Sequence, residues 1–170
     1  HYLSTLQEIR VLGLKDLPFC WGEIEECGKD PLENARQKAL AYYRICGQPV
    51  FSQDSGLYIE GLPKERQPGV HVRRVNGVNL TDEQMRKYYK KIAAEFGGRC
   101  VAQYQNAICR VFSENEIYEA RGGALNWKKF WLMTEERPQR MEGFPLDAIC
   151  ADYRTGRHFY DGEATMPEEE

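Results

Sequence analysis

Residues 25–57 read EECGKDPLENARQKALAYYRICGQPVFSQDSGL, and this stretch predicts a helix followed by two short strands. Asp30 is a favourable N-cap residue, and Pro31 suits the first helical position because its missing N–H would have no partner there. Glu33 stands three residues after the cap and is predicted to complete a capping box. Apolar residues then recur at helical spacing until Gly47, a residue type that commonly ends helices. The predicted helix is amphipathic, and we expect one face to pack on a core.

The residues after this helix predict a strand, a tight turn and a second strand. Residues 49–51 and 57–59 are rich in strand formers, while residues 53–56, Gln-Asp-Ser-Gly, have the composition of a turn. Such a turn would present Asp54 at a strand end, where it would join Glu33 of the first helical turn. Two carboxylates, with water or phosphate oxygens, are ligands that Mg²⁺ takes. A plainer reading also stands, in which Glu33 is only a cap and Asp-Ser-Gly an ordinary turn.

Five motifs that contain these residues occur in order along the chain. They are Glu25-Glu26-x-Gly28, Glu33-Asn34-Ala35-x-x-Lys38-Ala39, Asp54-Ser55-Gly56-Leu57, Pro68-Gly69-Val70-x-x-x-Arg74 and Gly143-Phe144-x-x-Asp147-x-Ile149. In order and approximate spacing they resemble the inosine/xanthosine triphosphate pyrophosphatase family, whose members hydrolyse non-canonical purine nucleoside triphosphates. The resemblance covers nearly the whole chain, and five ordered motifs are far more specific than one.

The resemblance implies a magnesium-dependent site that releases pyrophosphate from ITP, dITP or XTP. Glu33 and Asp54 would hold Mg²⁺, and Asp54 would also be the catalytic group that accepts a proton from the attacking water. Lys38 would face the phosphates. Phe144 would stack on the purine, while the carboxylate of Asp147 would read its edge. The full set of substrate-binding residues that the resemblance implies is Asn34, Lys38, Ser55, Gly56, Arg74, Phe144 and Asp147.

Departures from the family pattern keep two alternatives open. Gln53 stands where the family usually has a second acid before Asp54, Val72 replaces a common Ser, and residues 145–146 are Pro-Leu instead of Gly-Tyr. Residues 121–140 fit the family poorly and receive no role. One alternative is a nucleotide-binding module of the same fold without catalysis. The other is a pyrophosphatase that acts on other modified nucleoside triphosphates.

Composition indicates a single soluble domain of 170 residues with room for a sizeable core. The net charge of -3 gives no basic footprint for nucleic acid, and no apolar run is long enough to span a membrane. The six cysteines form no C-x-x-C pair and the three histidines are scattered, so a zinc site is not expected. With no secretory signal in the sequence, we expect reduced thiols and a cytoplasmic location.

The rest of the chain predicts an α/β fold, with a mixed central β-sheet, helices on its faces and a nucleotide cleft at the strand ends. Thr81 and Gln84 form a capping box that begins a second amphipathic helix. The other predicted elements are a strand over residues 9–14, a hairpin of residues 100–112 and 116–120, and a short strand over residues 148–151.

Family members begin with a strand and a Ser/Thr-x-Asn-x-x-Lys phosphate loop and end with a helix that leads to a Ser-His-Arg motif. Neither motif is found in residues 1–170, so we expect one nucleoside-triphosphate pyrophosphatase-like domain that is truncated at both ends. Family members are usually homodimers. The aromatic residues of the Trp127–Trp131 region suggest either a core edge or the subunit contact.

Overall fold

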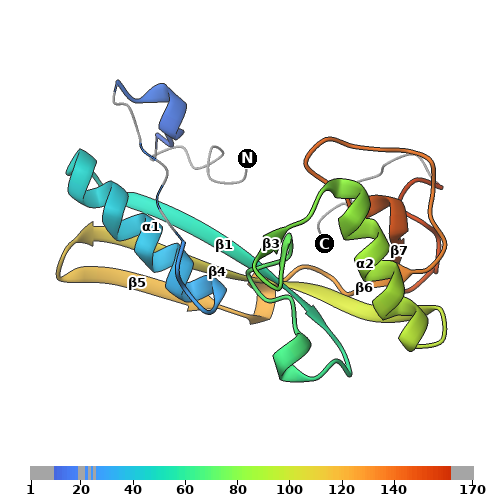
Figure 1. The fold of residues 1–170 in the computed structure, drawn as a ribbon. Helices are drawn as coiled ribbons and strands as arrows, with labels where there is room; N and C mark the ends of the chain where they lie inside the picture. The colour runs from blue at the N-terminus through green and yellow to red at the C-terminus, as the bar shows by residue number, and fades with distance from the viewer. Residues whose placement is uncertain (1–9, 19–21, 23, 25, 162–170) are drawn as a thin grey trace.

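The computed structural model describes residues 10–18, 22, 24 and 26–161, which form an antiparallel five-stranded sheet, a separate two-stranded ribbon and two α-helices (Figure 1). The strand order is β1-β4-β6-β7, with β5 paired to the other half of β4. The fold class is therefore α/β, as predicted. The elements are α1 (Pro31–Cys46), β1 (Val50–Ile59), β2 (Arg74–Val75), β3 (Val78–Asn79), α2 (Asp82–Glu95), β4 (Arg99–Ser113), β5 (Glu116–Arg121), β6 (Phe130–Met133) and β7 (Cys150–Asp152), with short 3-10 turns at Leu14–Asp16, Lys64–Arg66, Gly123–Leu125 and Asp147–Ile149.

Helix α1 begins and ends where the sequence predicts. The side chain of Asp30 accepts a hydrogen bond from the backbone N–H of Glu33 at 2.9 Å, and Gly47 ends the helix with a left-handed φ of 63°. The second half of the predicted capping box is wrong, because the Glu33 carboxylate accepts the backbone N–H of Lys29, at 2.8 Å. Glu33 therefore stabilises the loop that enters the helix.

The predicted turn at residues 53–56 is wrong, since these residues lie inside the ten-residue strand β1. They pair with β4 in an unbroken antiparallel register from Gln53 with Ile108 to Gly56 with Gln105. The glycine is needed for a tertiary contact and not for a turn. A Cβ on Gly56 would lie 3.1 Å from the carbonyl carbon of Gly69, whose segment bridges to the neighbouring residue of β1.

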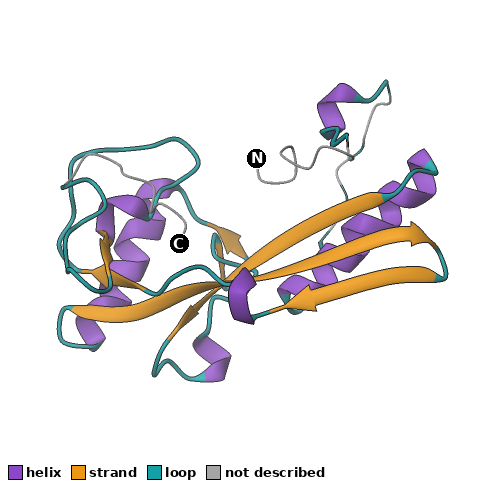
Figure 2. Ribbon diagram, turned by 180° about the vertical axis from the view of Figure 1, so that it is seen from behind, coloured by secondary structure: helices purple, strands orange, loops and turns teal. Residues whose placement is uncertain are grey.

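The two helices lie over opposite halves of the long strands β1 and β4 (Figures 1 and 2). They pack on opposite faces of β4, because Cys109 and Val111 contact the α1 side whereas Cys100 and Ala102 belong to the core of α2. Ala35 and Ala39 of α1 are fully buried against Cys109 and Val111 of β4. The larger core lies under α2 and contains Leu57, Ile59, Tyr89, Ile92, Leu132 and Ile149. Because side chains alternate along a strand, even-numbered residues of β1 face α1 and odd-numbered residues face away from it.

The hairpin and the second helix are confirmed. Strands β4 and β5 pair as predicted, and Thr81 and Gln84 exchange both hydrogen bonds of a capping box. The strand predicted over residues 9–14 is wrong in its described part, residues 10–14. This part is exposed and ends in a 3-10 turn, with no partner strand among the described residues. Residues 121–140, which received no role, contain β6, and strand β7 begins at Cys150 after a 3-10 turn.

Candidate active site

Asp54 lies on the face of β1 that α1 covers, and two side chains of that helix bind its carboxylate. Lys38 donates to Oδ1 through Nζ at 2.7 Å, and Asn34 donates to Oδ2 through Nδ2 at 3.2 Å. Asn34 and Lys38 are four residues apart, so they lie on the same face of the helix. The side chains of Lys38 and Asp54 are only 19% and 13% exposed. The structure therefore brings three of the predicted site residues together.

Lys38 also binds a second carboxylate, which received no role from the sequence. Its Nζ lies 3.0 Å from Oε1 of Glu26, in the loop before α1. Burial lowers the pKa of Lys38, but the hydrogen bonds and charges of Asp54 and Glu26 outweigh it, and the net pKa is raised. Lys38 is thus a fixed cation between two acids. The signal for Glu26 was its place in the first motif, beside Glu25.

Asn34 positions both partners of this cation. Its side chain is 2% exposed, and its Oδ1 accepts the backbone N–H of Gly28 at 2.8 Å while its Nδ2 binds Asp54. A Cβ on Gly28 would lie 2.4 Å from that Oδ1, so the approach of the loop requires glycine. The buried amide therefore fixes the loop that carries Glu26 relative to strand β1.

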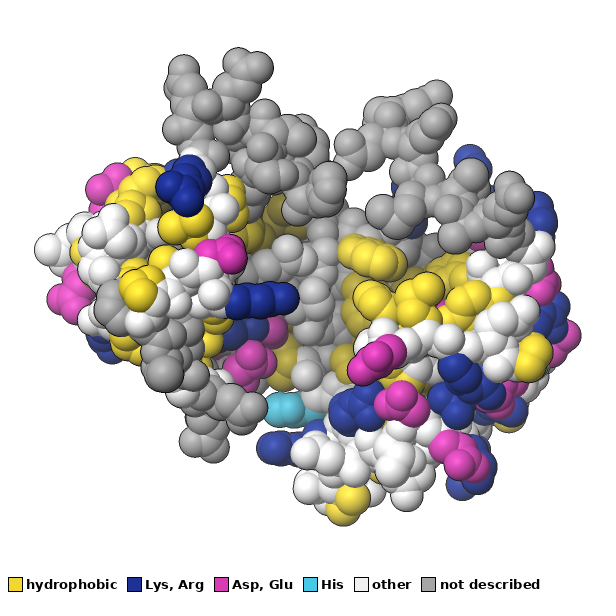
Figure 3. Space-filling model, turned by 90° about the horizontal axis from the view of Figure 1, so that it is seen from above, with side chains coloured by type: hydrophobic (Ala, Val, Ile, Leu, Met, Phe, Trp, Pro, Cys, Tyr) yellow, Lys and Arg dark blue, Asp and Glu magenta, His cyan; other side chains and the backbone are white. Residues whose placement is uncertain are grey.

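A cavity of about 480 Å³ begins at Glu26. Its lining includes His71, Arg73 and Arg74, together with Asn79 of β3, which accepts from Nε of Arg74 at 3.4 Å. Two guanidinium groups and an imidazole suit the anionic part of a ligand. A second cavity, of about 810 Å³, shares the Val70–His71 segment and extends to Lys29, Tyr58 and Lys64. Seen from above, the molecule has a hollow between the lobe that contains α1 and the lobe that contains α2, and both charged and hydrophobic side chains border it (Figure 3).

Ser55 and Gly56 follow Asp54 in β1 and face opposite sides of the strand. Ser55 points to the opposite face of β1, where its Oγ donates to Oδ1 of Asn106 at 2.7 Å. Asn106 is buried and donates to the carbonyl oxygen of Leu125 at 2.6 Å, which ties β1 to the segment after β5. Sequence reasoning missed Asn106, because nothing in the local pattern of β4 distinguishes it. Gly56 faces Asp54's side of the strand and admits the segment that leads to Arg74.

Phe144 and Asp147 lie between β6 and β7, in the lobe of α2. The ring of Phe144 is 52% exposed and thus accessible for stacking. Asp147 is partly buried, and burial raises the pKa of its carboxyl group. The pKa of Tyr104 of β4 is also raised, chiefly by burial and to a smaller extent by the negative charge of Asp147. No hydrogen bond or ion pair within the described residues connects this pair to Asp54.

Glu33 and Asp54 are oxygen donors suited to Mg²⁺. Within the described ranges there is no group of three or more His, Cys, Asp or Glu side chains that could enclose a metal ion. Mg²⁺, however, commonly takes one or two carboxylates and completes its shell with water and substrate phosphates. Glu33 is exposed and Asp54 has lone pairs beyond those used by Lys38 and Asn34, so the chemistry of these donors suits a partial site. That the two carboxylates hold one ion together stays a prediction.

Comparison with known proteins identifies a family. The model of the Ham1 family matches residues 1–126. The dITP/XTP pyrophosphatase of Geobacter sulfurreducens is 41% identical over 73 residues, which are 43% of this chain and 35% of that protein. The dITP/XTP pyrophosphatase of Treponema denticola is 31% identical over 137 residues, 79% of this chain and 66% of that protein. The Staphylococcus aureus Ham1 protein shares the fold, with a TM-score of 0.68, 22% identity and coverage of 96% of this chain and 80% of the other.

The chain spans less than two thirds of the length of these two curated relatives. The matched part includes the α1–β1 unit, the Arg74 segment and the β4–β5 hairpin, which together carry the Asp54 cluster and its cavity. In the described part of the chain no helix combines the length and the apolar character that crossing a bilayer requires.

Proposed function

The chain belongs to the Ham1 family, and from this we propose that it hydrolyses non-canonical purine nucleoside triphosphates such as ITP, dITP and XTP. The products would be the nucleoside monophosphate and pyrophosphate, so the reaction would remove these nucleotides from the pool. The observation that carries the proposal is the partly buried Asp54–Lys38–Glu26 cluster, whose Glu26 also lines the cavity that contains Arg73 and Arg74.

In the proposed reaction the oxygen of a water molecule attacks the α-phosphorus, and the bond from that phosphorus to the bridging oxygen breaks. Asp54 orients the water and accepts its proton, while pyrophosphate leaves with the bridging oxygen. Lys38 would turn from its carboxylates towards the phosphate oxygens, and Arg74 would bind the same charged tail. Mg²⁺, when bound by Glu33 and Asp54, would neutralise negative charge on the phosphate oxygens.

The base would be bound in the other lobe, by Phe144 and Asp147. The exposed ring of Phe144 supports stacking on a purine, and the partly buried Asp147 supports pairing with its edge. A 6-amino purine would leave at least one polar group unpaired in a site built for a 6-keto purine. Each such mismatch costs about 1–3 kcal/mol, so a few of them give strong discrimination.

The position of Gln53 bears on the alternative of a binding module without catalysis. Being odd-numbered in β1, Gln53 faces away from α1, on the side opposite to Asp54. A glutamine there leaves the charge of the Lys38–Asp54 pair unchanged. The missing acid is therefore a weaker argument against catalysis than the sequence suggested.

For partners and location we propose a homodimer in the cytoplasm. Trp127 is 57% exposed, which supports a subunit contact, whereas Phe130 is 4% exposed and belongs to the core. Light scattering over a range of concentrations, with Trp127→Ser as the variant, tests the contact; a monomer at every concentration would contradict it. Cys100, Cys109 and Cys150 are buried thiols, in keeping with a reducing compartment.

The test of the activity is a panel of ITP, XTP, GTP, ATP and dUTP with Mg²⁺, followed by separate assays for pyrophosphate and orthophosphate. We expect pyrophosphate from ITP and XTP, and a loss of at least roughly 100-fold in Asp54→Asn. Glu119→Gln is the matched control, because it removes a carboxylate that pairs with Arg36 on the surface of α1.

Each other outcome selects a rival. Tight binding of ITP without turnover would favour the binding module. Release of pyrophosphate from dUTP alone would favour a pyrophosphatase for other nucleotides. Equal loss of activity in Asp54→Asn and Glu119→Gln would show that the cluster around Asp54 has no special role.

A further inference from the structure

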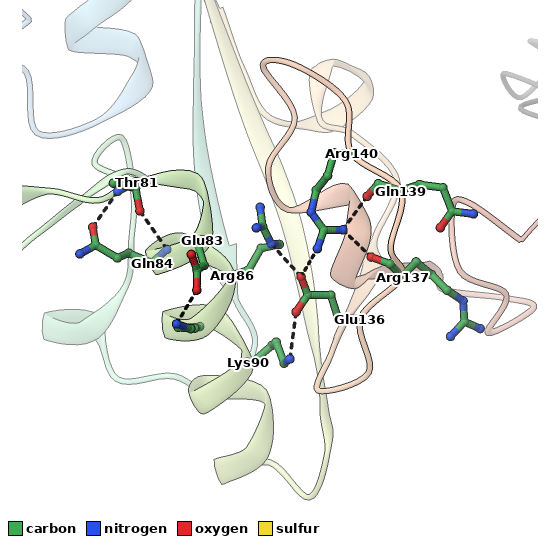
Figure 4. A network of polar contacts seen from close by, with 10 residues as sticks. Thr81, Glu83, Gln84, Arg86, Lys90, Glu136, Arg137, Gln139 and Arg140 are labelled. Carbon is green, nitrogen blue, oxygen red and sulfur yellow. Dashed lines mark hydrogen bonds and ion pairs between the residues drawn. The ribbon is translucent and has the colours of Figure 1, made fainter.

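Glu136, in the segment between β6 and β7, accepts hydrogen bonds from three cationic side chains (Figure 4). Arg86 and Lys90 reach it from α2, with Nε of Arg86 at 2.8 Å and Nζ of Lys90 at 3.0 Å. Arg140, from the same segment as Glu136, donates through a terminal guanidinium nitrogen at 2.7 Å. One carboxylate therefore joins the helix to the segment and folds the segment back on itself.

This cluster is partly shielded from solvent. The side chain of Arg86 is 11% exposed and that of Glu136 is 25% exposed, which distinguishes the pair from the surface ion pairs of α2. Burial raises the pKa of Glu136, but Lys90 and Arg86 outweigh it and the net pKa is lowered. Removal of the carboxylate charge would leave a shielded guanidinium without a counter-charge, which is strongly unfavourable.

The cluster connects helix α2 to the segment that carries Phe144 and Asp147. The segment begins at Thr134, whose backbone N–H donates to the carbonyl oxygen of Gly98 at 2.9 Å. Glu136 is its polar link to α2, while Leu146 packs in the core under the same helix. Arg140, bound to Glu136, stands four residues before Phe144. Residues 141–144 are exposed, so their position depends on such anchors at the base of the segment.

A second anchor lies beside the first. Arg137 donates two hydrogen bonds of 2.6 Å to the carboxylate of Asp161, and its backbone N–H donates to the carbonyl oxygen of Ala148 at 2.8 Å. These bonds close the base of the segment onto β7's side of the lobe. They do not involve α2, so removal of Glu136 would break the ion pairs between the segment and the helix while these bonds and the packing of Leu146 remain.

We propose that Glu136, held by Arg86, is a positioning residue for recognition of the base, because it fixes the segment that presents Phe144 and Asp147. The proposal rests on the proposed function for what is bound there. It adds that a residue without contact to the nucleotide sets how strongly the enzyme prefers a 6-keto purine. The chemical step at Asp54, on the other lobe, is not expected to depend on it.

Steady-state kinetics with ITP and ATP test the proposal in Glu136→Gln. We expect KM for ITP to rise about tenfold with kcat changed less than about twofold, and the preference for ITP over ATP to fall by about the same tenfold factor. Glu136→Asp, which keeps the charge, should recover most of the loss. Glu83→Gln is the control, since it breaks an exposed ion pair with Lys87 on the same helix and should leave all three quantities unchanged.

Hydrogen exchange of residues 137–147 provides a readout that needs no turnover. In Glu136→Gln we expect faster exchange there and unchanged exchange in α1 and β1. An unchanged KM, an unchanged ITP/ATP preference, or exchange that rises equally in all elements would overturn the proposal and leave Glu136 a purely structural residue. If the wild type released no pyrophosphate from ITP, the proposed function would fail. The dissociation constant of inosine monophosphate would then decide, and equal values in wild type and Glu136→Gln would overturn the positioning role.

Discussion

The ammonium group of Lys38 lies 2.7 Å from Oδ1 of Asp54 and joins helix α1 to the strand beneath it. The same ammonium lies 3.0 Å from Glu26, so a single cation organises two acids from separate segments. This arrangement holds the proposed proton acceptor in one orientation. It also places a positive charge next to Glu26, at the edge of the cavity in which we propose that the phosphates bind.

We expect Lys38→Met to lower the free energy of unfolding by about 1.5–3 kcal/mol near neutral pH, because hydrogen bonds to two carboxylates are lost. The pKa of Lys38 is raised in the folded state, so its contribution is fully present below 10.5, the ordinary lysine value, and is lost as the pH rises through the folded pKa. Urea unfolding of wild type and variant should therefore show a smaller difference at about pH 11 than at about pH 8.

Lys87→Met is the control for this pH dependence, since Lys87 makes an exposed ion pair with Glu83 of its own helix. It should change stability little at either pH. A difference between Lys38→Met and wild type that stays constant from pH 8 to 11 would mean that the methylene groups, and not the charge, supply the stabilisation.

The proposed metal site predicts that Glu33→Gln raises the Mg²⁺ concentration for half-maximal pyrophosphate release. The amide oxygen of glutamine can still accept the N–H of Lys29, so the entry to α1 should be kept while the charge is lost. Even changes outside the ligand shell commonly cost about tenfold in metal affinity, so loss of a ligand should cost at least that much. A Mg²⁺ titration of activity with Glu119→Gln as control checks this, and coincident curves would remove Glu33 from the site.

Two glycines of the loop before α1 give a matched pair of substitutions. A Cβ on Gly28 would lie 2.8 Å from the backbone nitrogen of Asn34, whereas a Cβ on Gly22 would meet nothing within 4 Å. We expect Gly28→Ala to destabilise the fold by about 1–3 kcal/mol through overpacking and Gly22→Ala to have little effect. Thermal unfolding measures both, and equal melting temperatures for the two variants would show that the loop does not pack as described.

The helices were predictable because their signals are local. Asp30, Pro31 and Gly47 bound α1, and Thr81 with Gln84 begins α2, through contacts within four residues along the chain. The error at residues 53–56 has a physical cause as well. Asp, Ser and Gly favour turns only when nothing else pairs their backbone, and here β4 pairs every one of them.

The candidate site was predictable in part for the same reason. Asn34 and Lys38 share a helix face by their spacing, so their meeting with a strand carboxylate follows from the pattern. Three other residues bind partners that are distant in the chain. Glu26 pairs with Lys38, 12 residues away, Asn106 with Ser55, 51 residues away, and Glu136 with Arg86, 50 residues away. No periodicity encodes such contacts, and they depend on the tertiary structure.

Substitution of Asp147 by asparagine should raise stability and lower substrate specificity. Burial raises the pKa of its carboxyl group, so the folded state favours the protonated acid. Its contribution to stability is therefore present below 3.8, the ordinary value, and is lost as the pH rises through the folded pKa. We expect Asp147→Asn to be more stable than wild type at about pH 7, with a smaller difference at about pH 4, and to lose preference for ITP over ATP.

Asp161→Asn provides the control of opposite sign. The hydrogen bonds from Arg137 lower the pKa of Asp161, so this carboxylate stabilises the fold above its ordinary pKa and the stabilisation is lost as the pH falls. Its amide variant should be less stable than wild type at about pH 7, as measured by urea unfolding. If Asp147→Asn were also less stable at that pH, the carboxylate of Asp147 would be a structural partner in its lobe, and its place in base recognition would lose this support.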